Sequence, residues 1–266
     1  MLSLSYLMRP SLHLPTMTDN VSNIHLSKAE FQEYGYRLVD WLAEYFDNVD
    51  QYQVLPSIEP GDIRNMLPVS APERAESMDE IIDDLDRVVM PGVAHWQHPG
   101  WYAFFPSGAS PVSALGEFVA AGLATQGMMW STAPAATEIE NTVLDWLVDL
   151  LGLPSSWRLD EGPGGGVIQM SASDSTHLSL AVARHQFELS GADANSLVAY
   201  GSSQAHSSIE KGARIAGFKH IRSVPVTQTF GIDADAFAQI VRDDIDSGLI
   251  PAWVCSAVGT TNTTAM

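Results

Sequence analysis

The sequence has one cysteine and few basic side chains, and each scarcity excludes a class of protein. A single cysteine in 266 residues rules out a disulfide within the chain, which favours a reducing compartment such as the cytoplasm. Only 13 Lys and Arg residues accompany 32 Asp and Glu residues, so nucleic acid and anionic membrane surfaces are not expected partners. Cys255 lies in an apolar run over residues 252–258 and is expected to pack rather than react.

Long apolar runs are also missing. No uninterrupted apolar stretch is long enough to cross a bilayer, and residues 1–25 lack the continuous apolar centre of a signal peptide. We therefore expect a cytoplasmic protein with a disordered leader at residues 1–25. The hydrophobic fraction of 45% is ordinary for a globular protein, and the length suits about two domains.

Several common site motifs are absent as well. The glycine run at residues 162–166 completes no G-x-G-x-x-G and precedes the predicted strand instead of following it, so it does not predict dinucleotide binding. There is no P-loop, no H-E-x-x-H and no G-x-S-x-G. His95 and His98 have H-x-x-H spacing without a nearby carboxylate or thiol, so a polar hinge is favoured over a metal site, and we predict no metal.

The first part of the chain is predicted to be helical. Ser27 and Glu30 form a capping box, as do Ser77 and Glu80, and each box opens an amphipathic helix with apolar residues at helical spacing. The proline-rich stretch at residues 55–72 between them predicts an extended connector. Because this region, residues 26–110, has too few apolar residues for its own core, we expect it to pack on another part of the assembly.

From residue 111 onward the pattern predicts an α/β domain. Two helices are expected first, at residues 111–128 and across residues 139–151. Strands and helices then alternate, with strands at residues 167–169, 197–200, 221–226 and 252–258, and helices at residues 173–189, 207–216 and 233–246. Repeated β-α-β units of this kind predict a parallel sheet with helices on its faces.

Small, hydroxyl and imidazole side chains follow three of the predicted strands. Residues 171–173 are Ser-Ala-Ser, His206 precedes a predicted capping box at residues 207–210, and Gly259 is followed by two threonines. Because ligands gather at the carboxyl ends of parallel strands, these residues are expected to share one site. Ser173 can serve as a helix cap, and the free N–H groups of that helix can hold a phosphate.

Five motifs in order resemble the aromatic-L-amino-acid decarboxylases, which are pyridoxal-phosphate-dependent group II decarboxylases. The resemblance runs from about Ser27 to the last residue, and its motifs are at residues 95–107, 130–138, 165–173, 204–208 and 259–261. It implies a fold-type I enzyme whose large domain binds pyridoxal 5'-phosphate (PLP) and spans residues 111–266 here. It also implies a homodimer, in which the helical segment at residues 26–110 wraps the partner and the active site lies at the interface.

The resemblance also implies roles for particular residues. Ala172 and Ser173 would hold the cofactor phosphate, His206 would stack on the pyridine ring as the catalytic histidine, and Thr261 would contact the cofactor. A loop dense in aromatic residues spans residues 95–106 and is called the aromatic loop. In and directly after this loop, the substrate-binding residues would be Trp96, Phe105, Pro106 and Ser107. Ser107 would meet the substrate carboxylate, and the other three would line the pocket for the side chain of an amino-acid substrate.

Two alternatives to an aromatic-amino-acid decarboxylase stay open from the sequence. One is a related decarboxylase of an acidic or aliphatic amino acid, against which the aromatic loop argues. The other is a non-catalytic truncated fragment, because the resemblance implies a cofactor-binding lysine downstream of Thr261. The only lysines are Lys28, Lys211 and Lys219, and none has the family's context.

Overall fold

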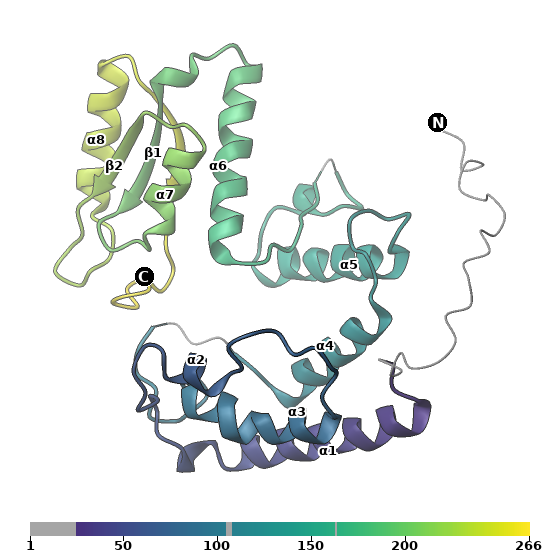
Figure 1. The fold of residues 1–266 in the computed structure, drawn as a ribbon. Coiled ribbons are helices and arrows are strands. Elements are labelled where there is room, and N and C mark those ends of the chain that lie inside the picture. The colour runs from purple at the N-terminus through teal and green to yellow at the C-terminus, as the bar shows by residue number, and fades with distance from the viewer. Residues whose placement is uncertain (1–24, 105–107, 163) are drawn as a thin grey trace. The chain divides into compact units, whose positions relative to one another are not determined.

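The computed structural model describes residues 25–104, 108–162 and 164–266. The chain forms two compact units, one built from the described residues up to Tyr102 and the other from Val112–Met266. Each unit is described by itself (Figure 1). Within the described ranges, no helix combines the length and the apolar composition needed to cross a membrane.

The N-terminal unit is helical, and both of its predicted capping boxes are confirmed. Helix α1 (Lys28–Asp47) begins after Ser27, whose Oγ accepts from the Glu30 N–H at 3.3 Å. The Glu30 carboxylate accepts in return from the Ser27 N–H at 2.7 Å. Helix α3 (Met78–Asp84) begins in the same way and continues through a π turn at Leu85–Val89 and a 3-10 turn at Met90–Gly92.

The sequence predicted an extended connector at residues 55–72, but in the structure the connector is only partly extended. A short helix, α2 (Asp62–Met66), lies within it, and a 3-10 turn at Val49–Gln51 precedes it. The prolines of the connector flank α2 and leave its backbone N–H groups available for helical hydrogen bonds. Gly61, at a φ of 109°, adopts the left-handed conformation that turns the chain into this helix.

The second unit begins with two helices, α4 (Pro111–Leu123) and α5 (Pro134–Leu150). Helix α4 ends five residues before the predicted position, because the chain turns after it: the Thr132 hydroxyl donates to the Gln126 carbonyl at 2.8 Å. Helix α5 ends as predicted, with Gly152 in the left-handed conformation at a φ of 64°. A 3-10 turn at Ser155–Trp157 follows.

The rest of this unit is a parallel sheet with helices packed against it, which confirms the predicted α/β class (Figure 1). The strands are β1 (Leu197–Ser202), β2 (His220–Val224) and β3 (Ile250–Cys255), in the order β2-β1-β3. Val198 pairs with His220 on one side of β1, and Leu197 pairs with Ile250 on the other. The helices are α6 (Ala172–Leu189), α7 (Ser208–Ile215) and α8 (Ala234–Asp246), with a 3-10 turn at Ala194–Ser196 before β1.

The strand predicted at residues 167–169 is wrong. These residues form no strand in the described chain, and Val167 and Ile168 are exposed. A strand needs a neighbour to pair with, and among the described residues no strand of the sheet pairs with residues 167–169. The Ile168 N–H is satisfied instead by the Glu140 carboxylate, at 2.7 Å.

The two faces of the sheet carry separate core clusters. On one face, Leu180 of α6 packs with Leu197 and Ala199 of β1. On the other, the alternate residues Val198 and Tyr200 pack against α8, as the two-residue period of a strand requires. Gly212 of α7 permits the close approach to α6, because a Cβ there would lie 2.6 Å from the His177 ring.

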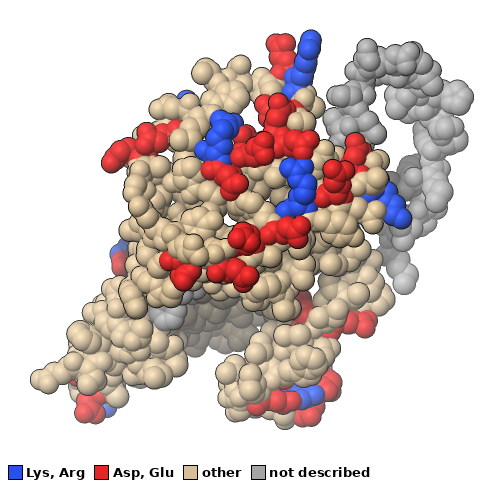
Figure 2. Space-filling model, turned by 90° about the horizontal axis from the view of Figure 1, so that it is seen from below, with Lys and Arg blue, Asp and Glu red and all other residues tan. Residues whose placement is uncertain are grey.

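Acidic side chains predominate over basic ones on the face shown in Figure 2. Many of the described arginines are paired with carboxylates, including Arg158 with Asp149 at 2.7 Å and Arg214 with Glu210 at 2.6 Å. Pairing of this kind leaves few free cations to form a basic patch.

A buried polar network joins β1, β2 and α8. The Tyr200 hydroxyl donates to the Asp244 carboxylate at 3.0 Å, and the Arg222 Nε donates to both carboxylate oxygens at 3.0 Å. Tyr200 is 1% exposed and Asp244 is 5% exposed. The Arg222 guanidinium lowers the pKa of Asp244, and burial raises the pKa of Tyr200. The network therefore ties the ionised carboxylate of α8 to two neighbouring strands.

We expect Asp244→Asn to lower the free energy of unfolding by about 1.5–3 kcal/mol at pH 7, because hydrogen bonds to a charged group are lost. A carboxyl whose pKa is lowered on folding contributes stability above its unfolded pKa, about 3.9, and loses it as the pH falls through the folded pKa. The difference in the free energy of unfolding between wild type and variant should therefore vanish in acid, below the folded pKa of Asp244. Urea unfolding from pH 7 down to that acid range measures this difference.

The control is Asp243→Asn, since the neighbouring Asp243 is exposed on α8. Its free energy of unfolding should stay within about 0.5 kcal/mol of wild type. Equal losses from the two substitutions would show that the buried network contributes nothing specific.

Candidate active site

Three segments meet at the carboxyl edge of the sheet. Because β1, β2 and β3 are parallel, their carboxyl ends lie on one edge. Helix α6 packs on the sheet and leads through a short connection into β1, so it runs in the opposite direction and its N-terminus lies at the same edge (Figure 1). The structure thus brings residues 171–173, His206 and residues 259–261 to one end of the sheet.

The N-terminus of α6 offers free backbone donors. Ser171, rather than Ser173, is the cap: its Oγ accepts from the Asp174 N–H at 3.1 Å. The N–H groups of Ala172 and Ser173 have no acceptor among the described residues, since they belong to the first turn of the helix. Two adjacent free N–H groups at the positive end of a helix dipole can bind an anion such as a phosphate.

His206 lies between β1 and α7, and its ring caps that helix. The predicted capping box at residues 207–210 is wrong, because the Ser207 side chain makes no capping hydrogen bond. The His206 Nδ1 takes this place: it lies 3.2 Å from the Ser208 nitrogen and 2.9 Å from the Ser208 Oγ. The remainder of the His206 ring is exposed and can meet a flat ligand.

In the turn after β3, the adjacent threonines Thr260 and Thr261 have different environments. Gly259 has a φ of 80°, and the N–H groups of Gly259 and Thr260 both donate to the Ala265 carbonyl at 3.1 Å. Thr260 is buried, with its Oγ1 2.6 Å from the Thr263 Oγ1. Thr261 is half-buried and its hydroxyl has no partner among the described residues. Thr261 is therefore the threonine of this turn that can contact a ligand.

A polar cavity of about 270 Å³ opens beside His206, between β1, β2 and α7. Ser202, Ser203 and Ser207 line it, together with Arg222. The protein is therefore hollowed next to the imidazole, on the side of α7.

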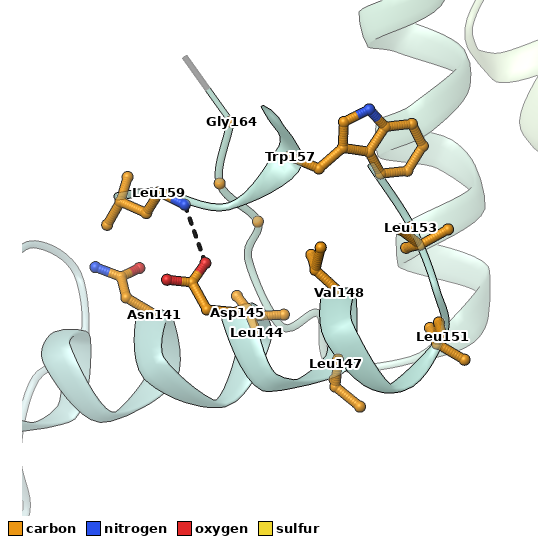
Figure 3. A pocket seen from close by; sticks show the side chains of 12 residues that line it. Asn141, Leu144, Asp145, Leu147, Val148, Leu151, Leu153, Trp157, Leu159 and Gly164 are labelled. Atoms are coloured by element: carbon orange, nitrogen blue, oxygen red, sulfur yellow. Dashed lines mark hydrogen bonds between the residues drawn. The ribbon is translucent and has the colours of Figure 1, made fainter. Parts of the chain in front are cut away.

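A second cavity, of about 310 Å³, is apolar, and none of the predicted cofactor-binding residues lines it (Figure 3). It is formed by leucines of α5 and the turn at Trp157, with Gly164, Gly165 and Gly166 along one wall. The structure explains the glycines: a Cβ on Gly164 would lie 2.3 Å from the carbonyl carbon of Trp157. The Asp145 carboxylate at its rim already accepts from the Leu159 N–H, at 3.0 Å.

The predicted substrate-binding residues belong to the aromatic loop. Trp96 stacks on Trp101 with ring centroids 4.6 Å apart, and both lie in the N-terminal unit. Phe105, Pro106 and Ser107 lie outside the described residues.

The two histidines of the H-x-x-H spacing have structural partners. The His95 Nδ1 lies 3.0 Å from the Tyr45 hydroxyl, and the His98 Nε2 lies 3.2 Å from the Asp50 carbonyl oxygen. Burial lowers the pKa of His95. In the part of the chain that is described, no three side chains of the metal-binding types gather.

Comparison with known proteins assigns this arrangement to a family. The model of the pyridoxal-dependent decarboxylase conserved domain matches residues 60–266. The aromatic-L-amino-acid decarboxylase of Catharanthus roseus is 39% identical over 246 residues, which cover 90% of this chain and 49% of that protein. The phenylacetaldehyde synthase of Arabidopsis thaliana is 38% identical over 247 residues, which cover 91% of this chain and 50% of that protein.

Solved structures agree with the sequence matches. Tryptophan decarboxylase of Catharanthus roseus in complex with L-tryptophan has a TM-score of 0.84 and 39% identity, over 91% of this chain and 53% of that chain. Oryza sativa TDC with PLP and tryptamine has a TM-score of 0.84 and 35% identity, over 91% and 51%. The chain spans about half the length of these relatives. With the family model matching most of its residues, this chain belongs to the pyridoxal-dependent decarboxylase family.

Proposed function

We propose that this chain is part of a PLP-dependent enzyme that decarboxylates an aromatic L-amino acid to the corresponding amine. The observation that carries the proposal is the meeting, at one sheet edge, of the free amides of Ala172 and Ser173 with the His206 ring and the Thr261 hydroxyl. Relatives at 36–39% identity include aromatic-L-amino-acid and tyrosine decarboxylases.

The donor set at the start of α6 suits the cofactor phosphate. Ala172 and Ser173 would donate their free N–H groups to the phosphate oxygens, and the helix dipole would favour its negative charge. The small side chains at residues 171–173 let the phosphate approach the backbone closely. Thr261 would add a hydroxyl from the turn after β3.

His206 would stack on the pyridine ring and hold it flat, as the catalytic histidine. When bound, the cofactor would supply an electron sink for the electron pair that departing carbon dioxide leaves on the substrate. The task of this chain is therefore orientation: its amides fix one end of the cofactor, and the imidazole fixes the ring plane.

The aromatic loop would supply the substrate pocket. Trp96, held by its stacking on Trp101, would form an apolar wall with Phe105 and Pro106, and Ser107 would meet the carboxylate. An aromatic wall favours an aromatic side chain over an acidic one. The lysine that binds the cofactor covalently would come from the part of the relatives' length that this chain does not cover, because none of its three lysines has the family's context.

The protein would form a homodimer, and the exposed apolar surface of α4 supports this. It would act in the cytoplasm on a small amino-acid substrate. Helix α4 carries only one charged residue, Glu117, yet Val112, Leu115 and Val119 are exposed. A contiguous exposed apolar helix face is typical of a protein–protein interface. We assign that surface to a second copy of the protein, with the helical N-terminal segment also contributing, and we expect neither nucleic acid nor membrane as a partner.

A panel of substrates tests the proposed reaction. The full-length protein, supplied with PLP and a panel of tryptophan, tyrosine, dihydroxyphenylalanine, phenylalanine and glutamate, should release carbon dioxide and form an amine from at least one aromatic member. Product analysis by mass spectrometry separates the amine from the aldehyde that a phenylacetaldehyde synthase would form. His206→Ala should lower kcat by about a hundredfold.

Three results would count against this proposal. Decarboxylation of glutamate alone would favour the acidic-substrate alternative, and no carbon dioxide from any substrate would favour a non-catalytic protein. Wild-type turnover by His206→Ala would remove the assigned role of the imidazole.

A variant of Ala172 tests the proposed binding of the cofactor phosphate by the N-terminus of α6. Ala172→Pro removes one N–H group at the first position of α6, where proline is tolerated, and the extended conformation of Ser171 (φ −152°, ψ 162°) is compatible with a following proline. PLP affinity should fall about tenfold or more, because a hydrogen bond to a charged group is lost. Titration by absorbance or fluorescence measures it.

Ala172→Gly is the matched control, since it changes the same side chain but keeps the N–H group. Its PLP affinity should remain within about threefold of wild type. Circular dichroism should show both variants folded. Unchanged PLP binding in a folded Ala172→Pro variant would contradict the assignment of this amide to the phosphate.

A further inference from the structure

We propose that Ser208 is a positioning residue that holds the His206 ring in the neutral tautomer protonated at Nε2. The proposal deepens the proposed function and rests on it for the catalytic consequence, whereas the tautomer itself follows from hydrogen bonds within the chain. Two groups of one residue face the same ring nitrogen: the Ser208 nitrogen at 3.2 Å and the Ser208 Oγ at 2.9 Å from the His206 Nδ1.

The backbone group decides the direction of these hydrogen bonds. A peptide N–H can only donate, so the His206 Nδ1 must accept and cannot carry the proton itself. Were Nδ1 protonated, it could still donate to the Ser208 hydroxyl, but the buried Ser208 N–H would lose its acceptor. Ser208 is 8% exposed, so water cannot readily replace that acceptor. The tautomer with the proton on Nε2 therefore satisfies both Ser208 groups.

The position of Ser208 is fixed by helix α7 and by β1. Ser208 is the first residue of α7, where the N–H has no partner inside the helix. The start of this helix packs closely on the strand, because a Cβ on Gly201 would lie 2.9 Å from the Ile209 Cγ2. A rotation of the His206 ring by half a turn would place a C–H group against the Ser208 N–H. The ring is thus held in one orientation as well as one tautomer.

The consequence is that the exposed side of the ring carries a hydrogen-bond donor. Nε2 has no hydrogen-bond partner among the described residues, and with Nδ1 occupied it holds the ring's one proton. In the proposed site, this Nε2–H is the group of His206 that can donate to the substrate or to the cofactor. Ser208 acts on the reaction through His206 and needs no contact with either.

Nuclear magnetic resonance of the full-length protein, labelled with ¹⁵N at its histidine rings, tests the tautomer directly. Comparison with His206→Gln identifies the signals of this ring. We expect Nδ1 to show the shift of an unprotonated ring nitrogen and Nε2 that of a protonated one. A proton on Nδ1, or an even mixture of tautomers, would overturn the proposal.

Paired serine variants test the role of the Ser208 hydroxyl. Ser208→Ala removes one of the two groups that face Nδ1 and keeps the backbone N–H, so it should raise the share of the second tautomer without making it dominant. It should lower kcat about three- to tenfold with little change in KM. Ser208→Thr keeps a hydroxyl and should retain the wild-type tautomer and kcat. Ser190→Ala is the control, because Ser190 is an exposed serine at the C-terminal end of α6, and it should leave the ring spectrum and kcat unchanged. Identical spectra and kcat in Ser208→Ala and wild type would overturn the positioning role.

The two proposals fail separately. A protein that decarboxylates aromatic amino acids with the His206 proton on Nδ1 retains its proposed function and refutes the tautomer. A protein that shows the Nε2 proton but forms no amine retains the hydrogen-bonding arrangement and loses the proposed function.

Discussion

The parallel pairing of β1 with both of its neighbours is the constraint on which the candidate site depends. Because β2 and β3 run in the same direction as β1, His206 and Thr261, which follow β1 and β3, come to one edge. The same pairing directs α6 back along the sheet, so that the free amides of Ala172 and Ser173 lie at that edge. Residues separated by about 90 positions in sequence thereby become candidates for one ligand.

The site is built largely from backbone groups and from side chains that satisfy them. The first turn of α6 leaves its amides free, whereas the first turn of α7 is closed by the imidazole of His206. The two helix starts therefore have different uses, although both follow serine-rich segments. This difference depends on one hydrogen bond, between the Ser208 N–H and the His206 Nδ1, and it determines which helix start can receive an anion.

Much of the fold could be predicted from local patterns, and the errors have physical causes. The capping boxes at Ser27 and Ser77 were correct because each involves groups only three residues apart. The strand predicted at residues 167–169 was wrong because a strand requires a partner, and an apolar triplet does not reveal whether one exists. The capping box predicted at residues 207–210 was wrong because His206, which lies outside that motif, accepts the Ser208 N–H at the start of α7.

The sequence by itself determined the α/β class, the helical character of the first part of the chain and the family, since periodicity and ordered motifs are properties of residues close along the chain. Only the tertiary structure decided that Thr260 is buried whereas Thr261 is half-buried, and that the N-terminus of α6 shares one edge of the sheet with His206. It also showed that Gly164 packs against Trp157 and Gly166 against Leu144. These outcomes depend on which groups meet across the fold and on which of them burial leaves without water, and such meetings are not encoded in the spacing of neighbouring residues.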